Sequence, residues 1–156
     1  MQRTEVLERI EVAETIPLPV AVVWDAHEDM RLLERIAPSF PSIRLKETNL
    51  VCGLGTHLTL RFDFLGLGFD WRVKITQWDP PVGFVDEQVS GPFHFWEHTH
   101  RFMAITAEST RIVDVVKYEL NPLLDGTVIR WGLEAMFKLR MHNLKQALIS
   151  QSNYLP

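Results

Sequence analysis

The chain has 156 residues, of which 46% are hydrophobic, so one globular domain over residues 1–156 with a substantial core is expected. The formal net charge of -4 argues against the extended basic face of nucleic-acid-binding proteins, and we expect no nucleic-acid partner. The single cysteine excludes an internal disulfide and suits a reducing compartment, so we expect a cytoplasmic protein.

The first part of the chain predicts one strand followed by two short helices. Residues 4–15 alternate between apolar and charged side chains, as in a β-strand. The apolar spacing over residues 20–40 predicts two helices that are separated near residues 27–29. The N-terminal residues are charged and the chain has no run of about 18 apolar residues, so we expect neither a signal peptide nor an integral membrane segment.

The middle of the chain predicts six further strands, because apolar residues alternate with polar ones between turn signals. In residues 70–78, for example, Trp71, Val73 and Ile75 share one face of the strand. Turns are expected at "CGLG", "GLGF", Asp79-Pro80-Pro81, "SGPF" and near residues 107–109. The predicted strands cover residues 42–50, 56–64, 70–78, 83–90, 93–105 and 110–120.

The last segment changes its period and predicts one long amphipathic helix over residues 127–150. Its apolar residues recur at spacings of three and four, at Ile129, Leu133, Met136, Phe137, Leu144 and Leu148. Such a helix must bury its apolar side against the sheet, which indicates an α+β fold. A curved sheet around this helix can leave a cavity, a common kind of site for small ligands.

This order of elements, together with "FVDEQVSGPFHFWEHTHRF" (residues 84–102) and "DVVKYEL" (residues 114–120), resembles the START-like superfamily with its helix-grip fold. That superfamily, also called SRPBCC, includes polyketide cyclase/dehydrase-like proteins, and the resemblance covers nearly the whole chain. It implies an antiparallel sheet of about seven strands wrapped on the C-terminal helix. It also implies a deep cavity under that helix, which different members use to carry lipids, to bind hormones or to cyclise polyketides.

The stretch "FHFWEHTHRF" (residues 93–102) brings histidine, glutamate and aromatic side chains close together in the sequence. Strand alternation places Trp96, His98 and His100 on one face, and the aromatic residue makes this the inward face. Folding back at the flanking turns brings Asp86 near His98 and Asp114 near His100, within one or two residues of register. Each inward histidine therefore has a candidate carboxylate partner on a neighbouring strand.

The predicted cavity has a polar part and an apolar part. Its polar wall is expected to consist of Asp86, Gln88, His98, His100, Asp114 and Tyr118. Its apolar wall is expected to consist of Phe62, Phe64, Trp71, Trp96, Met136, Phe137 and Met141. The other histidines, His27, His57 and His142, are expected to be solvated.

Several functional hypotheses stay open. The first is a protein that binds or carries a small hydrophobic, lipid- or polyketide-like ligand without catalysis. The second is a cyclase/dehydrase-like enzyme in which His98 or His100 acts as a general base with Asp114 or Asp86. The third is a protein-interaction module with a vestigial cavity, whose partner the sequence does not identify. In all three, the polar set could also serve simply as a mutually hydrogen-bonded network that holds strand register.

A metal site is the least favoured interpretation of the histidines. A His-x-His pair on a strand directs both imidazoles the same way, as a metal ion needs, and Asp86, Asp114 or His94 could be a third ligand. The carboxylates, however, already have a role as histidine partners. We therefore expect no metal and no cofactor.

Overall fold

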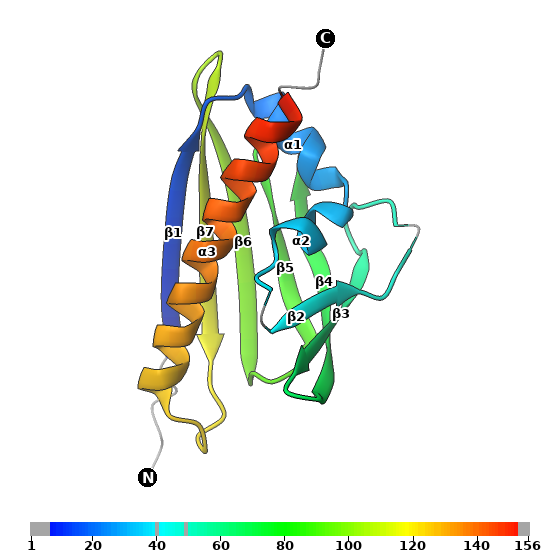
Figure 1. The fold of residues 1–156 in the computed structure, drawn as a ribbon, viewed down its shortest axis with the longest axis vertical. Helices are drawn as coiled ribbons and strands as arrows, with labels where there is room; N and C mark the ends of the chain where they lie inside the picture. Colours follow the sequence, from blue (N-terminus) through cyan, green and yellow to red (C-terminus); the bar gives the residue numbers. More distant parts are fainter. Residues whose placement is uncertain (1–6, 40, 49, 153–156) are drawn as a thin grey trace.

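The structure is a computed structural model that describes residues 7–39, 41–48 and 50–152 (Figure 1). One strand and two short helices come first, six strands follow, and a long helix ends the described chain. Their bounds are β1 Glu8–Ile16, α1 Val20–Glu28, α2 Arg31–Ile36, β2 Ser42–Leu45, β3 His57–Phe64, β4 Leu67–Asp79, β5 Gly83–Ser90, β6 Phe95–Thr106, β7 Ser109–Glu119 and α3 Gly126–Ser152. The predicted order of elements is confirmed.

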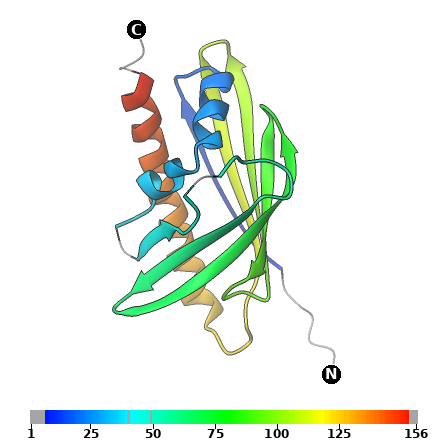
Figure 2. The ribbon, with the colours of Figure 1, turned by 90° about the vertical axis from the view of Figure 1, so that its right-hand side faces the viewer.

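The seven strands form one antiparallel sheet in the order β1-β7-β6-β5-β4-β3-β2. Figure 1 shows α3 crossing the sheet diagonally, in front of β1, β7 and β6. Figure 2 shows how strongly the sheet curls, so that β2 lies beside α2. This is the α+β helix-grip architecture that the sequence predicted.

β1 begins at Glu8, and residues 4–6 of its predicted range lie outside the described residues. Among the other strand ends, those of β2 and β4 differ most from the prediction. The strand expected over residues 42–50 ends at Leu45, because the Glu47 carboxylate accepts the backbone N–H of Thr59 at 2.8 Å in place of a strand partner. The β3–β4 turn occupies only Leu65 and Gly66, whose φ angles are 49° and 81°. Two residues with positive φ are enough for a tight hairpin, so β4 begins at Leu67 instead of Asp70.

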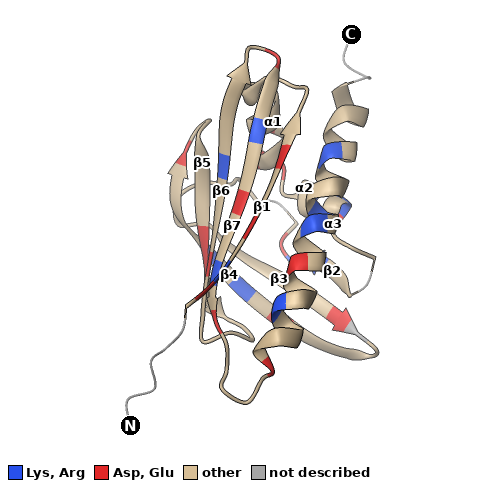
Figure 3. Ribbon diagram, turned by 90° about the vertical axis from the view of Figure 1, so that its left-hand side faces the viewer, with Lys and Arg blue, Asp and Glu red and all other residues tan. Residues whose placement is uncertain are grey.

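The core lies between α3 and the concave face of the sheet. The helix buries Phe137, Met141, Leu144 and Leu148, whose spacing of three and four residues keeps them on one side. From the sheet, the alternating residues of β4 and β6 bury Trp71, Val73, Trp96 and Phe102. Figure 3 shows that charged residues of both signs are spread along β1, β6, β7 and α3. Within the described residues, no helix combines the length and apolar character needed to cross a membrane.

Candidate functional site

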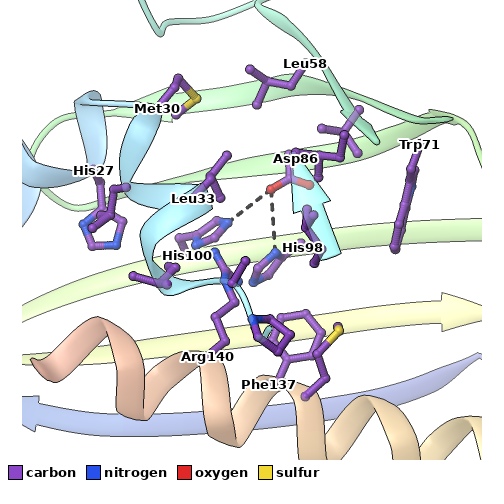
Figure 4. A pocket seen from close by; sticks show the side chains of 18 of the residues that line it. His27, Met30, Leu33, Leu58, Trp71, Asp86, His98, His100, Phe137 and Arg140 are labelled. Carbon is purple, nitrogen blue, oxygen red and sulfur yellow. Dashed lines mark hydrogen bonds and ion pairs between the residues drawn. The ribbon is translucent and has the colours of Figure 1, made fainter. Parts of the chain in front are cut away.

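A cavity of about 120 Å³ lies between the concave face of the sheet, α2 and α3 (Figure 4). Most of its wall is apolar and comes from many elements, including Met30, Leu33, Leu58, Phe62, Trp71 and Phe137. The polar side chains of the wall are His27, Asp29, Asp86, His98, His100 and Arg140. The cavity therefore combines a hydrophobic interior with a cluster of ionisable groups, as binding sites for small molecules commonly do.

Strand register brings the ionisable groups of the sheet together. Asp86 on β5 is paired with His98 on β6, and His100 is paired with Asp114 on β7. His98 and His100 are both buried and stand two residues apart, so their side chains leave the same face of β6. The predicted neighbours of both histidines are confirmed.

The two imidazoles lie side by side between two carboxylates. His100 is held at both nitrogens, with Nε2 hydrogen-bonded to Asp86 Oδ2 at 3.1 Å and Nδ1 lying 3.2 Å from Asp114 Oδ1. His98 faces the same two oxygens at longer range, with Nδ1 3.8 Å from Asp86 Oδ2 and Nε2 3.7 Å from Asp114 Oδ1. The ring centroids of the histidines are 3.8 Å apart. His100 is therefore the tightly held member of the pair and His98 the loosely held one.

Burial and charge divide the protons unequally between these groups. Burial lowers the pKa of His98 to about 4, and the neighbouring His100 adds to the effect. Burial acts on His100 too, but Asp114 and Asp86 outweigh it and raise the pKa of His100 above its ordinary value. Burial likewise opposes ionisation of Asp114, yet His100 holds the pKa of Asp114 well below its usual range. Of the two histidines, His100 thus holds a proton more readily, and His98 is neutral at pH 7.

Arg140 supplies a positive charge that the sequence analysis missed. Its Nη1 atom lies 3.5 Å from Asp114 Oδ2, and its guanidinium lies 5.7 Å from the Phe137 ring centre. Helical spacing could have predicted the inward position of Arg140, because residue 140 follows the inward residues Met136 and Phe137 by about one turn. Arg140 thus places a permanent positive charge beside the buried carboxylate of Asp114.

The side chain of His27 is buried, so the prediction from the sequence that it is solvated is wrong. The residue is only 7% exposed, lines the cavity, and packs on Phe102 with ring centroids 4.6 Å apart. Its Nδ1 donates to the Val23 carbonyl at 2.7 Å, so the other nitrogen, Nε2, is the acceptor of the neutral ring. Burial lowers the pKa of His27 to about 4. The four-residue spacing from buried Val23 was the overlooked signal, whereas His57 and His142 are exposed as expected.

Most of the predicted binding residues lie in the cavity wall. These are Phe62, Trp71, Asp86, Trp96, His98, His100, Met136 and Phe137. The side chain of Phe64 lies outside the described part of the structure.

Four predicted wall residues do not line the cavity, and each has another position. The side-chain amide of Gln88 forms hydrogen bonds with the backbone of Phe93 in the β5–β6 turn. Asp114 lies behind the two histidines as seen from the cavity. Tyr118 and Met141 are buried within the apolar core. Strand and helix periodicity identified these residues as inward-facing, but whether an inward side chain meets a cavity or a neighbour depends on three-dimensional packing.

Comparisons with known proteins agree with this architecture. A protein of Thermus thermophilus is 19% identical, with a TM-score of 0.73 over 93% of this chain and 99% of that chain. The Zhui aromatase/cyclase of a Streptomyces species is 18% identical, with a TM-score of 0.67 over 95% of this chain and 94% of that chain. Norcoclaurine synthase of Thalictrum flavum, solved with dopamine and hydroxybenzaldehyde, is 13% identical, with a TM-score of 0.71 over 93% and 88%.

At these identities the solved structures show a shared fold. No curated protein matches the sequence. The model of the family described as "Polyketide cyclase / dehydrase and lipid transport" matches residues 16–148, which is most of the chain. The helix-grip fold and this match together show that the chain belongs to the polyketide cyclase/dehydrase and lipid transport family of the START-like (SRPBCC) superfamily.

Proposed function

We propose that this protein binds a small, mainly hydrophobic ligand in the cavity beneath α3. The observation that carries the proposal is the composition of the wall, in which apolar side chains from the sheet, α2 and α3 surround one polar cluster. An apolar ligand gains free energy by displacing water from the apolar wall, while polar groups fix its orientation. The polar end of the ligand would meet Asp86, His98 and Arg140.

The volume of the cavity limits the size of the ligand that it can hold. Sites for drug-sized molecules enclose about 300–1,000 Å³, whereas this cavity encloses about 120 Å³. A single aromatic ring or a short chain suits such a space better than a long polyketide or a whole lipid. Norcoclaurine synthase, which has the same fold, was solved with two compounds of this small aromatic kind, dopamine and hydroxybenzaldehyde, and this supports the proposed ligand class.

The test is to fill the cavity from the helix. Met136 lines the cavity and Leu139, three residues later, is 46% exposed, so Met136→Trp and Leu139→Trp form a matched pair. Binding of hydroxybenzaldehyde, a single-ring compound of the size that the cavity allows, to the full chain is followed by isothermal calorimetry. We expect Met136→Trp to weaken binding by at least about tenfold, since the added ring occupies the site. Leu139→Trp is expected to bind like the original protein, and equal binding by both variants would contradict the proposal.

A second candidate function, cyclase- or dehydrase-like catalysis, is favoured by the state of His98. This histidine lines the cavity and is neutral, and both of its nitrogens lie more than 3.5 Å from the carboxylates that they face. One nitrogen is thus available to remove a proton from a bound substrate, with Asp86 or Asp114 stabilising the imidazolium. The family of the chain includes cyclases and dehydrases by its description.

Catalysis is tested with His98→Ala and His98→Gln on a short β-keto thioester of a size that the cavity allows. We expect both variants to keep the far-ultraviolet circular dichroism spectrum and to lose turnover, because the proton acceptor is gone. Turnover that survives in either folded variant would exclude His98 as the base. Loss of folding in both variants would instead indicate that His98 holds the sheet together.

A further inference from the structure

We infer that Asp86, His98 and His100 form a binding site for a divalent transition-metal ion at the polar end of the cavity. One ligand atom from each of these three residues lies within 4.8 Å of the other two. All three side chains line the cavity, and Figure 4 shows them converging on one point from β5 and β6. The inference goes beyond ligand binding in the cavity and does not depend on it.

The distances suit an ion between the carboxylate and the two rings. Two ligands about 2.1 Å from one ion, at the angles of tetrahedral or octahedral coordination, are about 3.0–3.4 Å apart. Asp86 Oδ2 lies 3.1 Å from His100 Nε2 and 3.8 Å from His98 Nδ1. The separation of Asp86 from His100 is therefore already suitable, and that of Asp86 from His98 is a few tenths of an ångström too long.

Asp114 lies in the position of a carboxylate that would orient metal-bound histidines. A metal-bound histidine usually donates its other ring N–H to a carboxylate, which fixes the orientation of the ring. Asp114 Oδ1 faces the outer nitrogens of both histidines, at 3.2 Å from His100 Nδ1 and 3.7 Å from His98 Nε2. Asp86 and Asp114 thus lie on opposite sides of the imidazole pair, one as a ligand and one as a support.

The state of His98 is an independent observation that points to an ion. The residue is 5% exposed, and its Nε2 has no hydrogen-bond partner among the described residues. A neutral imidazole has one donor, yet both nitrogens of His98 face carboxylate oxygens. An ion at Nδ1 resolves this conflict, because the proton then sits on Nε2 and points at Asp114. A buried polar group without a partner is costly, so the ion would stabilise this arrangement.

The donor set indicates the class of ion. Two imidazole nitrogens and one carboxylate oxygen suit Zn²⁺ and Fe²⁺, whereas Mg²⁺ and Ca²⁺ prefer oxygen ligands throughout. Three protein ligands leave at least one coordination position open, on the side of the cavity. With both histidines neutral, the positive charges of a divalent ion and of Arg140 would together exceed the negative charges of Asp86 and Asp114. An anionic oxygen of water or of a ligand is therefore the expected occupant of the open position.

The first test is titration of the metal-stripped full chain with ZnCl₂ by isothermal calorimetry and with CoCl₂ by visible absorption. We expect one ion per chain and the intense visible bands of Co²⁺ in a site with fewer than six ligands. In histidine ¹⁵N spectra, Zn²⁺ should shift His98 and His100 and leave the exposed His57 and His142 unchanged. Absence of stoichiometric binding of Zn²⁺, Co²⁺ and Fe²⁺ to the original protein, or shifts confined to exposed histidines, would overturn the inference.

Variants locate the ion. Asp86→Asn and His98→Gln should abolish stoichiometric binding, and Asp114→Asn should weaken it by about 10–100-fold, as loss of a supporting carboxylate does. His94→Ala is the matched control, because His94 is an exposed histidine just before β6. Unchanged affinity in folded Asp86→Asn would exclude the site. Binding of hydroxybenzaldehyde by the metal-free protein tests the proposed hydrophobic site separately, so failure of either proposal is distinguishable from failure of the other.

Discussion

The guanidinium of Arg140 on α3 lies 3.5 Å from the carboxylate of Asp114 on β7. Asp114 is 4% exposed, so this contact joins the long helix to the sheet through a buried ion pair. The same carboxylate also faces His98 and His100. Arg140 therefore influences the candidate site through the residue behind it, as well as lining the cavity itself.

Loss of Arg140 should be costly, because it leaves Asp114 with less positive charge in a buried position. We expect Arg140→Gln to lower the free energy of unfolding by about 2–3 kcal/mol, measured by urea denaturation. Arg130→Gln is the control on the same helix, since Arg130 pairs with Glu8 and Glu134 at the surface, and its loss should matter far less. Equal losses in the two variants would show that Arg140 does not stabilise Asp114.

His27 should make the protein less stable in acid. Its pKa is lowered to about 4 in the folded protein, so the unfolded chain binds a proton more readily between pH 6.5 and 4. Stability from this residue is present above pH 6.5 and is lost as the pH falls, by about 3 kcal/mol at pH 4. His27→Leu should remove this part of the pH dependence.

The measurement is the urea midpoint of both proteins at pH 7, 5.5 and 4. The difference in stability between His27→Leu and the original protein should shift in favour of the variant as the pH falls. A parallel pH dependence of the two proteins would mean that His27 is not buried in its neutral form. His142→Leu, at an exposed histidine of α3, is the control and should follow the original protein.

Gln88 should contribute to stability and not to ligand binding. Its side chain donates to the Phe93 carbonyl at 2.7 Å and accepts from the Phe93 N–H at 3.4 Å, across the β5–β6 turn. Gln88→Ala should cost about 1–2 kcal/mol of unfolding free energy and leave binding of hydroxybenzaldehyde unchanged. Gln77→Ala, at an exposed position of β4, should change neither property. Weaker probe binding in folded Gln88→Ala would place its side chain at the ligand.

The hydroxyl of Tyr118 should be dispensable. Tyr118 is fully buried beside Phe93 and Trp96, and its hydroxyl has no hydrogen-bond partner among the described residues. Removing an unpaired buried polar group is neutral or favourable, so Tyr118→Phe should unfold at the same or a higher urea concentration. Tyr118→Leu, which removes the ring, should cost about 2 kcal/mol or more. A comparable loss in Tyr118→Phe would show that the hydroxyl has a partner.

The sequence was sufficient for the fold because local periodicity reports which side of each element is buried. Alternation in β4 and β6 identified the inward residues Trp71 and Trp96, and the spacing of Phe137 and Leu144 identified the buried side of α3. The family resemblance then supplied the arrangement of these elements. Errors were confined to strand ends, where one side-chain hydrogen bond, as at Glu47, decides whether pairing continues.

For the candidate site, the amino-acid pattern was enough to predict that two inward histidines on β6 meet carboxylates of β5 and β7, because side chains alternate and hairpins pair neighbouring strands. The folded structure adds that His100 lies close to both carboxylates while His98 does not. It alone brought Arg140 and His27 to the same cavity, since residues far apart in the chain meet only when helices pack on the sheet. Differences of less than 1 Å separate a hydrogen bond from an open contact, and no periodicity in a sequence specifies distances that small.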